Sequence, residues 1–181
     1  DEGQFDNQEE VFGISGALAL YRASALEDVR FNDEFFDTDF FAYKEDVDLA
    51  YRLQYAGWKS LFEPNAIAHH YRGVYGKEKM GFFERIKNRR SKSKQLSFYS
   101  TRNHWLLILK NIDPVSLIVN LPRLVFTEVA RTIYVFIFEP RNIFVFADVF
   151  RLVPKIAKKR SHIFKNKKIS GRKIRKQFVC R

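Results

Sequence analysis

The stretch FFAYKEDVDLAYRL, residues 40–53, decides how the first half of this chain folds. Its second part has the apolar periodicity of a helix, and Gly57 follows as a natural helix stop. We therefore predict a helix over residues 45–56. Three carboxylates stand within four positions where this helix begins: Glu45, Asp46 and Asp48. Carboxylates beside apolar side chains are common general bases.

Two interpretations of these carboxylates are open. Acidic side chains at a helix N-terminus are favoured by the helix macrodipole alone, and the same position also fixes a carboxylate for catalysis. On a helix, Glu45 and Asp48 are three residues apart and share a face, whereas Asp46 is turned about 100° away. The three carboxylates therefore cannot all point into one pocket.

Shorter elements are expected on both sides of this helix. We predict, in chain order, a strand or strand pair broken by glycines over residues 11–21, a short helix over 22–29, a loop over 31–43, strands over 59–62 and 66–70, and a helix over 98–109. The strand over 66–70 ends in His69 and His70. Adjacent strand residues point to opposite faces, so at most one of these histidines serves a site.

Charge divides the chain into two parts. Its 181 residues carry a net charge of +11, but residues 1–76 alone carry −9 and residues 77–181 carry +20. An acidic part suits chemistry or cation binding, and a basic part suits a polyanion or an anionic membrane. The one cysteine, Cys180, cannot form an internal disulfide, which fits a reducing compartment.

The basic part contains two amphipathic segments. Its longest uncharged run in residues 113–160 is the nine residues 114–122, too short for a membrane span of about 20 residues. Pro122 should kink the first helix or start a second one there, and another amphipathic helix is expected over 143–159. Polar residues recur along one stripe of the first segment: Ser116, Asn120, Arg123, Thr127 and Arg131.

Three partners fit these basic helices. The first is an anionic membrane surface, where each basic residue contributes about 1 kcal/mol. The second is the catalytic domain or another subunit. The third is nucleic acid, but the polybasic tail has few aromatic side chains to stack on bases, and no nucleic-acid motif is present. We expect the membrane surface and no nucleic acid.

An ordered set of motifs carries a family resemblance. It closely resembles the acceptor-side half of family 2 glycosyltransferases, most of all rhamnosyltransferase-type enzymes that build cell-surface polysaccharide. The resemblance covers residues 3–112. The motifs are Gly16-Ala17 with Leu20-Tyr21-Arg22, FNDEFF (31–36), YKEDVDL (43–49), Tyr51-Arg52-Leu53 with Gly57-Trp58, Pro64-Asn65-Ala66 leading to His69-His70, and Arg102-Asn103.

The resemblance implies a GT-A fold, a nucleotide-sugar donor, a divalent metal (Mg²⁺ or Mn²⁺) and inversion at the sugar carbon. Asp46 becomes the general base that removes the acceptor hydroxyl proton, and Glu45 orients the helix end or contacts the acceptor. The histidine that contacts metal or diphosphate in the family falls on His70, with His69 as the alternative. Cofactor binding is assigned to Arg102.

The acceptor side of the cleft is assigned to the backbone around Ser15, Gly16 and Ala17. Trp58 is placed with the acceptor-binding residues, although its position after the helix favours packing over catalysis. Enzymes of this type often act on polyprenyl-diphosphate acceptors, which makes an interfacial anchor useful. We therefore expect a polyprenyl-diphosphate-linked or polysaccharide acceptor, and a protein peripheral to the cytoplasmic face of the cell membrane.

The resemblance also indicates a missing part. The family's first half, with a βαβ nucleotide-binding unit and an Asp-x-Asp motif, has no counterpart here, and Asp37-Thr38-Asp39 lies in the wrong place and is interpreted as loop. We expect the chain, which begins without Met, to belong to a longer protein and to be inactive in transfer by itself. The alternative is a non-catalytic membrane-surface or scaffolding protein that keeps the fold.

The predicted fold is therefore α/β, the C-terminal part of a GT-A glycosyltransferase followed by amphipathic membrane-interface helices. Residues 1–112 form the acceptor-side half of the catalytic domain. Residues 113–160 form the interface region, and residues 161–181 form the polybasic tail.

Overall fold

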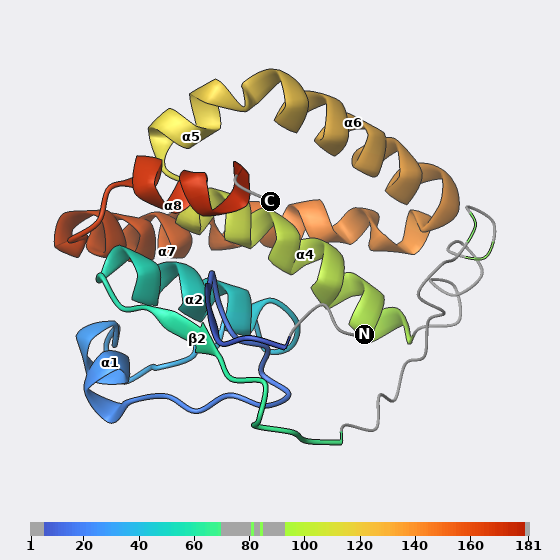
Figure 1. Ribbon diagram of the computed structural model, residues 1–181. Helices are drawn as coiled ribbons and strands as arrows, with labels where there is room; N and C mark the ends of the chain where they lie inside the picture. The colour runs from blue at the N-terminus through green and yellow to red at the C-terminus, as the bar shows by residue number, and fades with distance from the viewer. Residues whose placement is uncertain (1–5, 70–80, 82–83, 85–92, 180–181) are drawn as a thin grey trace.

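The computed structural model describes residues 6–69, 81, 84 and 93–179, and in these the chain is mostly helical (Figure 1). The predicted α/β class is confirmed only in part, because the sheet has just two short strands. The elements are β1 (Glu9–Val11), α1 (Ala23–Asp28), α2 (Glu45–Tyr55), β2 (Ser60–Phe62), α4 (Lys94–Asn111), α5 (Pro114–Val119), α6 (Leu121–Phe138), the 3-10 helix η1 (Pro140–Ile143), α7 (Phe144–Asn166) and α8 (Gly171–Val179).

The two strands pair antiparallel, with Glu9 opposite Phe62 and Val11 opposite Ser60. The strand predicted over residues 11–21 is therefore wrong beyond Val11. The next residues lie against α2 instead: Gln54 Nε2 donates to the Phe12 carbonyl at 3.0 Å. A Cβ on Gly13 would come within 2.4 Å of the Ala50 Cβ, so only glycine lets the backbone approach α2 this closely.

Most of the predicted helices are confirmed. Helix α2 covers the predicted span and is followed by Gly57 in a left-handed conformation (φ 88°). Helices α1 and α4 also lie where the pattern placed them, and α4 is longer at both ends. The strand predicted over residues 66–70 is absent from its described part, 66–69, where no second strand lies alongside to pair with it.

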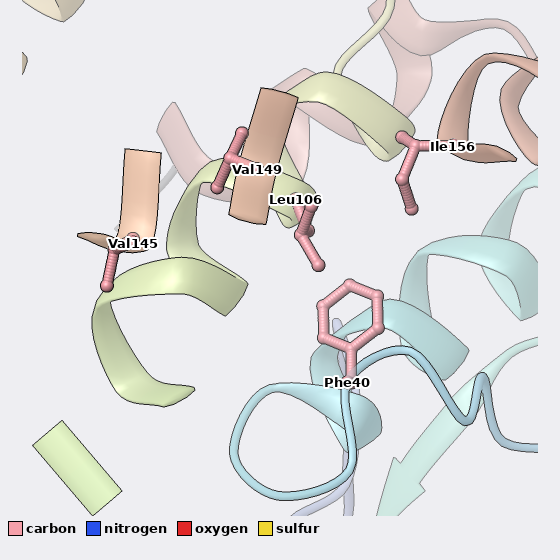
Figure 2. Close-up of a cluster of buried hydrophobic side chains, with 5 residues drawn as sticks. All are labelled: Phe40, Leu106, Val145, Val149 and Ile156. Atoms are coloured by element: carbon pink, nitrogen blue, oxygen red, sulfur yellow. The ribbon is translucent and has the colours of Figure 1, made fainter. Parts of the chain in front are cut away.

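The main core lies between α4 and α7, with the loop before α2 closing one side. Figure 2 shows the ring of Phe40 directed toward Leu106 of α4, with Val145, Val149 and Ile156 of α7 around them. All five side chains are buried. A second cluster packs α1 on α2 around Ala25 and Leu49. The apolar face of α7 therefore packs within this chain.

A buried ion network holds the same elements together. The Lys110 ammonium contacts Asp37 at 2.5 Å and Asp48 at 2.7 Å, and the Lys159 ammonium contacts Asp37 at 2.5 Å. Burial by itself would raise the pKa of Asp37, but the two ammonium groups outweigh it and lower this pKa to about 2. Some of the acidic side chains of the first part of the chain are thus neutralised inside the fold by lysines of α4 and α7.

Helices α5 and α6 arch over the α4–α7 layer (Figure 1). Pro122 stands in the first turn of α6, as predicted for the start of a second helix. Of the α6 side chains only Glu128 and Val135 are buried, whereas Phe126 is 76 % exposed. None of the helices in the described parts of the chain combines the length and apolarity needed to cross a membrane.

Candidate active site

Asp46 lies at the start of α2 beside the turn formed by residues 15–17. Its Oδ2 accepts the backbone N–H of Gly16 at 3.1 Å, and its Oδ1 accepts that of Val47 at 2.8 Å. The side chain is half-buried, while Ser15, Gly16 and Ala17 are exposed. The structure thus brings together four residues that the sequence assigned to base catalysis and acceptor binding. Each carboxylate oxygen keeps a second lone pair that can accept a further proton donor.

The loop that leads into α2 holds an unusual backbone. Phe41, Tyr43 and Lys44 all have positive φ values, of 57°, 67° and 67°, and such residues cost about 1–3 kcal/mol each unless their surroundings hold them. Here the buried side-chain amide of Asn103 holds this backbone in place. Its Nδ2 lies 2.6, 2.7 and 2.8 Å from the carbonyl oxygens of Phe40, Ala42 and Tyr43. Asn103 therefore fixes the start of the helix that carries Asp46.

Arg102 acts on the preceding part of the same loop. Its guanidinium donates to the Asp39 carbonyl and, at 3.1 Å, to the Asp148 carboxylate on α7. The side chain is buried and also packs over the Tyr99 ring at 4.7 Å. These contacts give Arg102 a structural role in tying the loop to α4 and α7. Its assignment to cofactor binding stays a prediction.

Helix α6 contributes an inward-facing group near this site. Both carboxylate oxygens of Glu128 lie 2.9 Å from His104 Nε2, and Arg131 Nε lies 3.2 Å from the same carboxylate. Burial lowers the pKa of His104, and the hydrogen bond that His104 donates to Glu128 opposes this change without restoring the ordinary pKa. A neutral imidazole must then donate its Nε2 proton to Glu128. No local signal in the sequence predicts this pair, because His104 and Glu128 lie 24 residues apart in the chain.

Two further side chains respond to the charge of Asp46. Burial and then the Asp46 carboxylate raise the pKa of Tyr21, which keeps its phenol protonated. Burial and then Arg131 lower the pKa of Lys44, while Asp46 and Glu128 act in the opposite direction. Tyr21 and Lys44 therefore belong to the surroundings of the candidate base. Tyr21 belongs to one of the family motifs, and the structure adds its electrostatic interaction with Asp46.

Of the other two carboxylates of α2, Asp48 points away from the Asp46 site. Asp48 is fully buried and contacts Arg52 at 2.9 Å, Lys110 at 2.7 Å and Asn111 at 2.8 Å. It anchors the ion network and does not face the Gly16 turn. Glu45 is half-buried, and its Oε2 has no hydrogen-bond partner among the described residues.

Trp58 does not reach the Asp46 site. It follows the far end of α2, whose 11 residues span about 16 Å, and its Nε1 donates to Asp28 at 3.0 Å. The ring packs against the α1–α2 cluster. Packing was the role favoured by its position, and acceptor binding stays a prediction.

The predicted metal ligand, His70, lies outside the described residues, and His69 is exposed at the end of its segment. Within residues 6–69, 81, 84 and 93–179, no three His, Cys, Asp or Glu side chains are grouped so as to hold a metal ion. Metal binding stays a prediction, and no chemical step is assigned to a metal here.

Comparisons with known proteins identify the family of this chain. The family model described as "Glycosyl transferase family group 2" matches residues 3–138. Over 58 residues the chain is 45 % identical to N-acetylglucosaminyl-diphospho-decaprenol L-rhamnosyltransferase of Mycobacterium tuberculosis, in strains CDC 1551 and H37Rv. That match covers 32 % of this chain and 18 % of the relative, so it spans less than a fifth of the relative's length. No solved structure matches the chain significantly.

Proposed function

Because the chain belongs to the family 2 glycosyltransferases, we propose that it supplies the acceptor-activating side of an inverting glycosyl transfer. The donor is a nucleotide-sugar, as is usual in this family. The acceptor is a lipid-linked or polysaccharide hydroxyl in cell-surface glycan synthesis, and L-rhamnose is the sugar that the named relative suggests. The donor-holding side of the reaction belongs to a longer protein that includes these residues.

The observation that carries this proposal is the way in which hydrogen bonds hold the Asp46 carboxylate in place. Its carboxylate is held by two backbone N–H groups, of Gly16 and Val47, at the end of a helix whose entry loop is fixed by Asn103. A general base needs such a fixed position, because catalysis depends on the geometry of proton transfer. The acceptor hydroxyl gives its proton to Asp46 as its oxygen attacks the sugar carbon. The nucleoside diphosphate leaves from the opposite face, which inverts that carbon.

The position of α6 supports a lipid-linked acceptor. Its inner side places Glu128 on His104, next to the loop that leads to Asp46. Its other sides leave large apolar side chains exposed: Leu121, Val125, Phe126, Val129, Ile133, Phe136 and Ile137. Exposed apolar surface of this extent marks an interaction site. We propose that it lies in an anionic membrane surface, so that a lipid-bound acceptor enters the Asp46 site from beside α6.

The test of the base is Asp46→Asn in a full-length protein that includes these 181 residues. Asparagine has nearly the same shape but does not take up a proton, so kcat should fall by about 10²–10⁴. Donor affinity, measured by titration with the nucleotide-sugar, should change less than about twofold, since the change acts on the chemical step. Asp33→Asn, at an exposed acidic residue, is the matched control. Turnover by Asp46→Asn close to that of the control would remove Asp46 as the base.

A further inference from the structure

A second feature lies farther along α4, away from the base. An apolar groove of about 330 Å³ runs between α4, α5 and α7. Its volume falls within the range of about 300–1,000 Å³ that is usual for ligand pockets. Leu109 and Val153 in its walls are 39 % and 38 % exposed, so the groove opens to solvent. The lining residues are Ile108, Leu109, Ile112, Leu117, Val153, Ile156, Ala157 and Arg160.

The lining selects against polar ligands. Arg160 is the one charged residue in the lining, and its Nη1 already donates to the carbonyl of Leu109 at 2.9 Å. A nucleotide or sugar buried here would lose its contacts with water and regain few of them. An extended peptide would fare no better, because the walls are helices whose backbone groups are bonded within each helix. A hydrocarbon chain needs none of these partners.

The surroundings of the groove favour a lipid over a protein partner. Its mouth at Val153 is flanked, one helical turn earlier on α7, by Phe150, which is 75 % exposed. Arg160, two helical turns beyond Val153 on the same face of α7, places a cation in the lining of the groove. Apolar side chains beside a cation match the polarity and the charge of an anionic lipid. The groove also begins at Ile108, one helical turn beyond His104.

We propose that this groove binds the isoprenoid chain of the lipid-linked acceptor. This inference rests on the proposed function, and it assigns the chain-binding site of the acceptor to α4, α5 and α7. The chain enters past Leu109 and Val153, packs on Ile112 and Leu117, and leaves the diphosphate at the protein surface. Binding at this place would hold the sugar end of the acceptor on the side of α4 that carries His104.

The experiment measures binding of farnesyl diphosphate to the 181-residue chain by calorimetric titration. We expect saturable binding that Ala157→Phe, which fills the groove from an exposed position on α7, weakens at least about tenfold. Ala147→Phe is the matched control, because Ala147 is exposed on the same helix outside the groove. A second pair, Leu117→Trp in the groove and Ile118→Trp outside it, repeats the test on α5 and guards against one variant failing to fold.

One other ligand completes the test. Inorganic diphosphate should bind much more weakly than farnesyl diphosphate, because the contacts in the groove are made by the hydrocarbon chain. Equal loss in the groove and control variants, or equal binding of inorganic diphosphate, would each overturn the proposal. Binding needs no donor and no turnover. If the chain binds farnesyl diphosphate as expected but Asp46→Asn stays active, the proposed base is wrong and the groove proposal stands. If Asp46→Asn is inactive but the chain does not bind farnesyl diphosphate, the groove proposal is wrong and the proposed base stands.

Discussion

Helices α6 and α7 are both long, amphipathic and close in sequence, but they bury their apolar residues to very different extents. In α7, Val145, Val149, Ile156 and Ile163 are buried against the rest of the chain, whereas in α6 Val135 is the one apolar residue that is buried. This difference in burial parallels a difference in the ion pairs that each helix makes. Lysines of α7 meet carboxylates across the interface, while α6 places Glu128 on His104 and leaves most of its surface exposed.

This contrast divides the interpretations of the C-terminal part between two helices. Packing on the rest of the chain applies to α7, and a membrane surface is proposed for α6. The contrast also decides which variants can test the membrane surface by binding to lipid vesicles. Removing residues 113–181 would take away half of the main core, so a loss of vesicle binding would not distinguish an absent surface from an unfolded protein. Single substitutions on the two helices are sharper tests of the comparison.

The largest effect is expected for Lys159→Met on α7. The Lys159 ammonium is almost fully buried and contacts Asp37 at 2.5 Å and Asp39 at 2.8 Å. Removing one partner of a buried ion pair leaves an uncompensated charge and costs about 3–5 kcal/mol. Urea unfolding should show a loss of that size. The neighbouring Lys158→Met, at an exposed position, should change the free energy of unfolding by less than about 0.5 kcal/mol. Similar values for both would show that the α7 interface does not form.

A hydrophobic pair tests the same contrast without charge. Ile156 of α7 is 2 % exposed and Ile133 of α6 is 52 % exposed. Ile156→Ala should cost about 2–5 kcal/mol through lost burial and a cavity. Ile133→Ala should cost under about 1 kcal/mol in the absence of lipid, since its side chain already meets water. Thermal unfolding of the two variants measures the difference. Equal losses would mean that α6 is packed as tightly as α7.

The sequence was sufficient for the elements whose signals are local. The acidic start and glycine stop of α2, and the proline at the start of α6, are written in neighbouring residues. The segment after Val11 was misassigned because its glycines let it lie on α2 instead of in the sheet. A strand also requires a partner, and residues 66–69 have none among the described residues. Such partners are set by tertiary contacts that periodicity does not report.

Some residues of the candidate site can likewise be predicted from local motifs, whereas others depend on tertiary contacts. The family motifs identified Asp46 and the Gly16 turn, and the structure places them in contact. Asp48 has the same charge two positions on, but only the fold shows it buried against Lys110 of α4. The contacts of Asn103 and Glu128 with residues far away in the chain likewise depend on how the helices pack.

A pH titration sharpens the account of the α7 interface. The pKa of Asp37 lies at about 2 in the folded state, below its ordinary value of 3.8. A lowered folded-state pKa contributes stability that is present above the ordinary value and lost as the pH falls toward 2. The difference in unfolding free energy between the unmodified chain and Asp37→Asn should narrow by about 1 kcal/mol between pH 5 and pH 3. A constant difference over this range would show that Asp37 is not paired with Lys110 and Lys159.

The smallest effect concerns charge on the two helices. Arg123 of α6 is exposed and makes no ion pair within the described parts of the chain, whereas Lys155 of α7 contacts Asp39 at 2.6 Å. A free cation near an anionic membrane contributes about 1 kcal/mol, or roughly fivefold in partitioning. Arg123→Gln should therefore weaken co-sedimentation with phosphatidylserine vesicles about fivefold, and less so at high salt. Lys155→Gln should have a smaller effect, because Asp39 already neutralises that charge.

If the two variants lost equal affinity, or if neutral vesicles bound the chain equally well, α6 would not be an electrostatic membrane contact. An equal loss would also mean that the acidic loop does not shield α7, which would remove the contrast between the two helices.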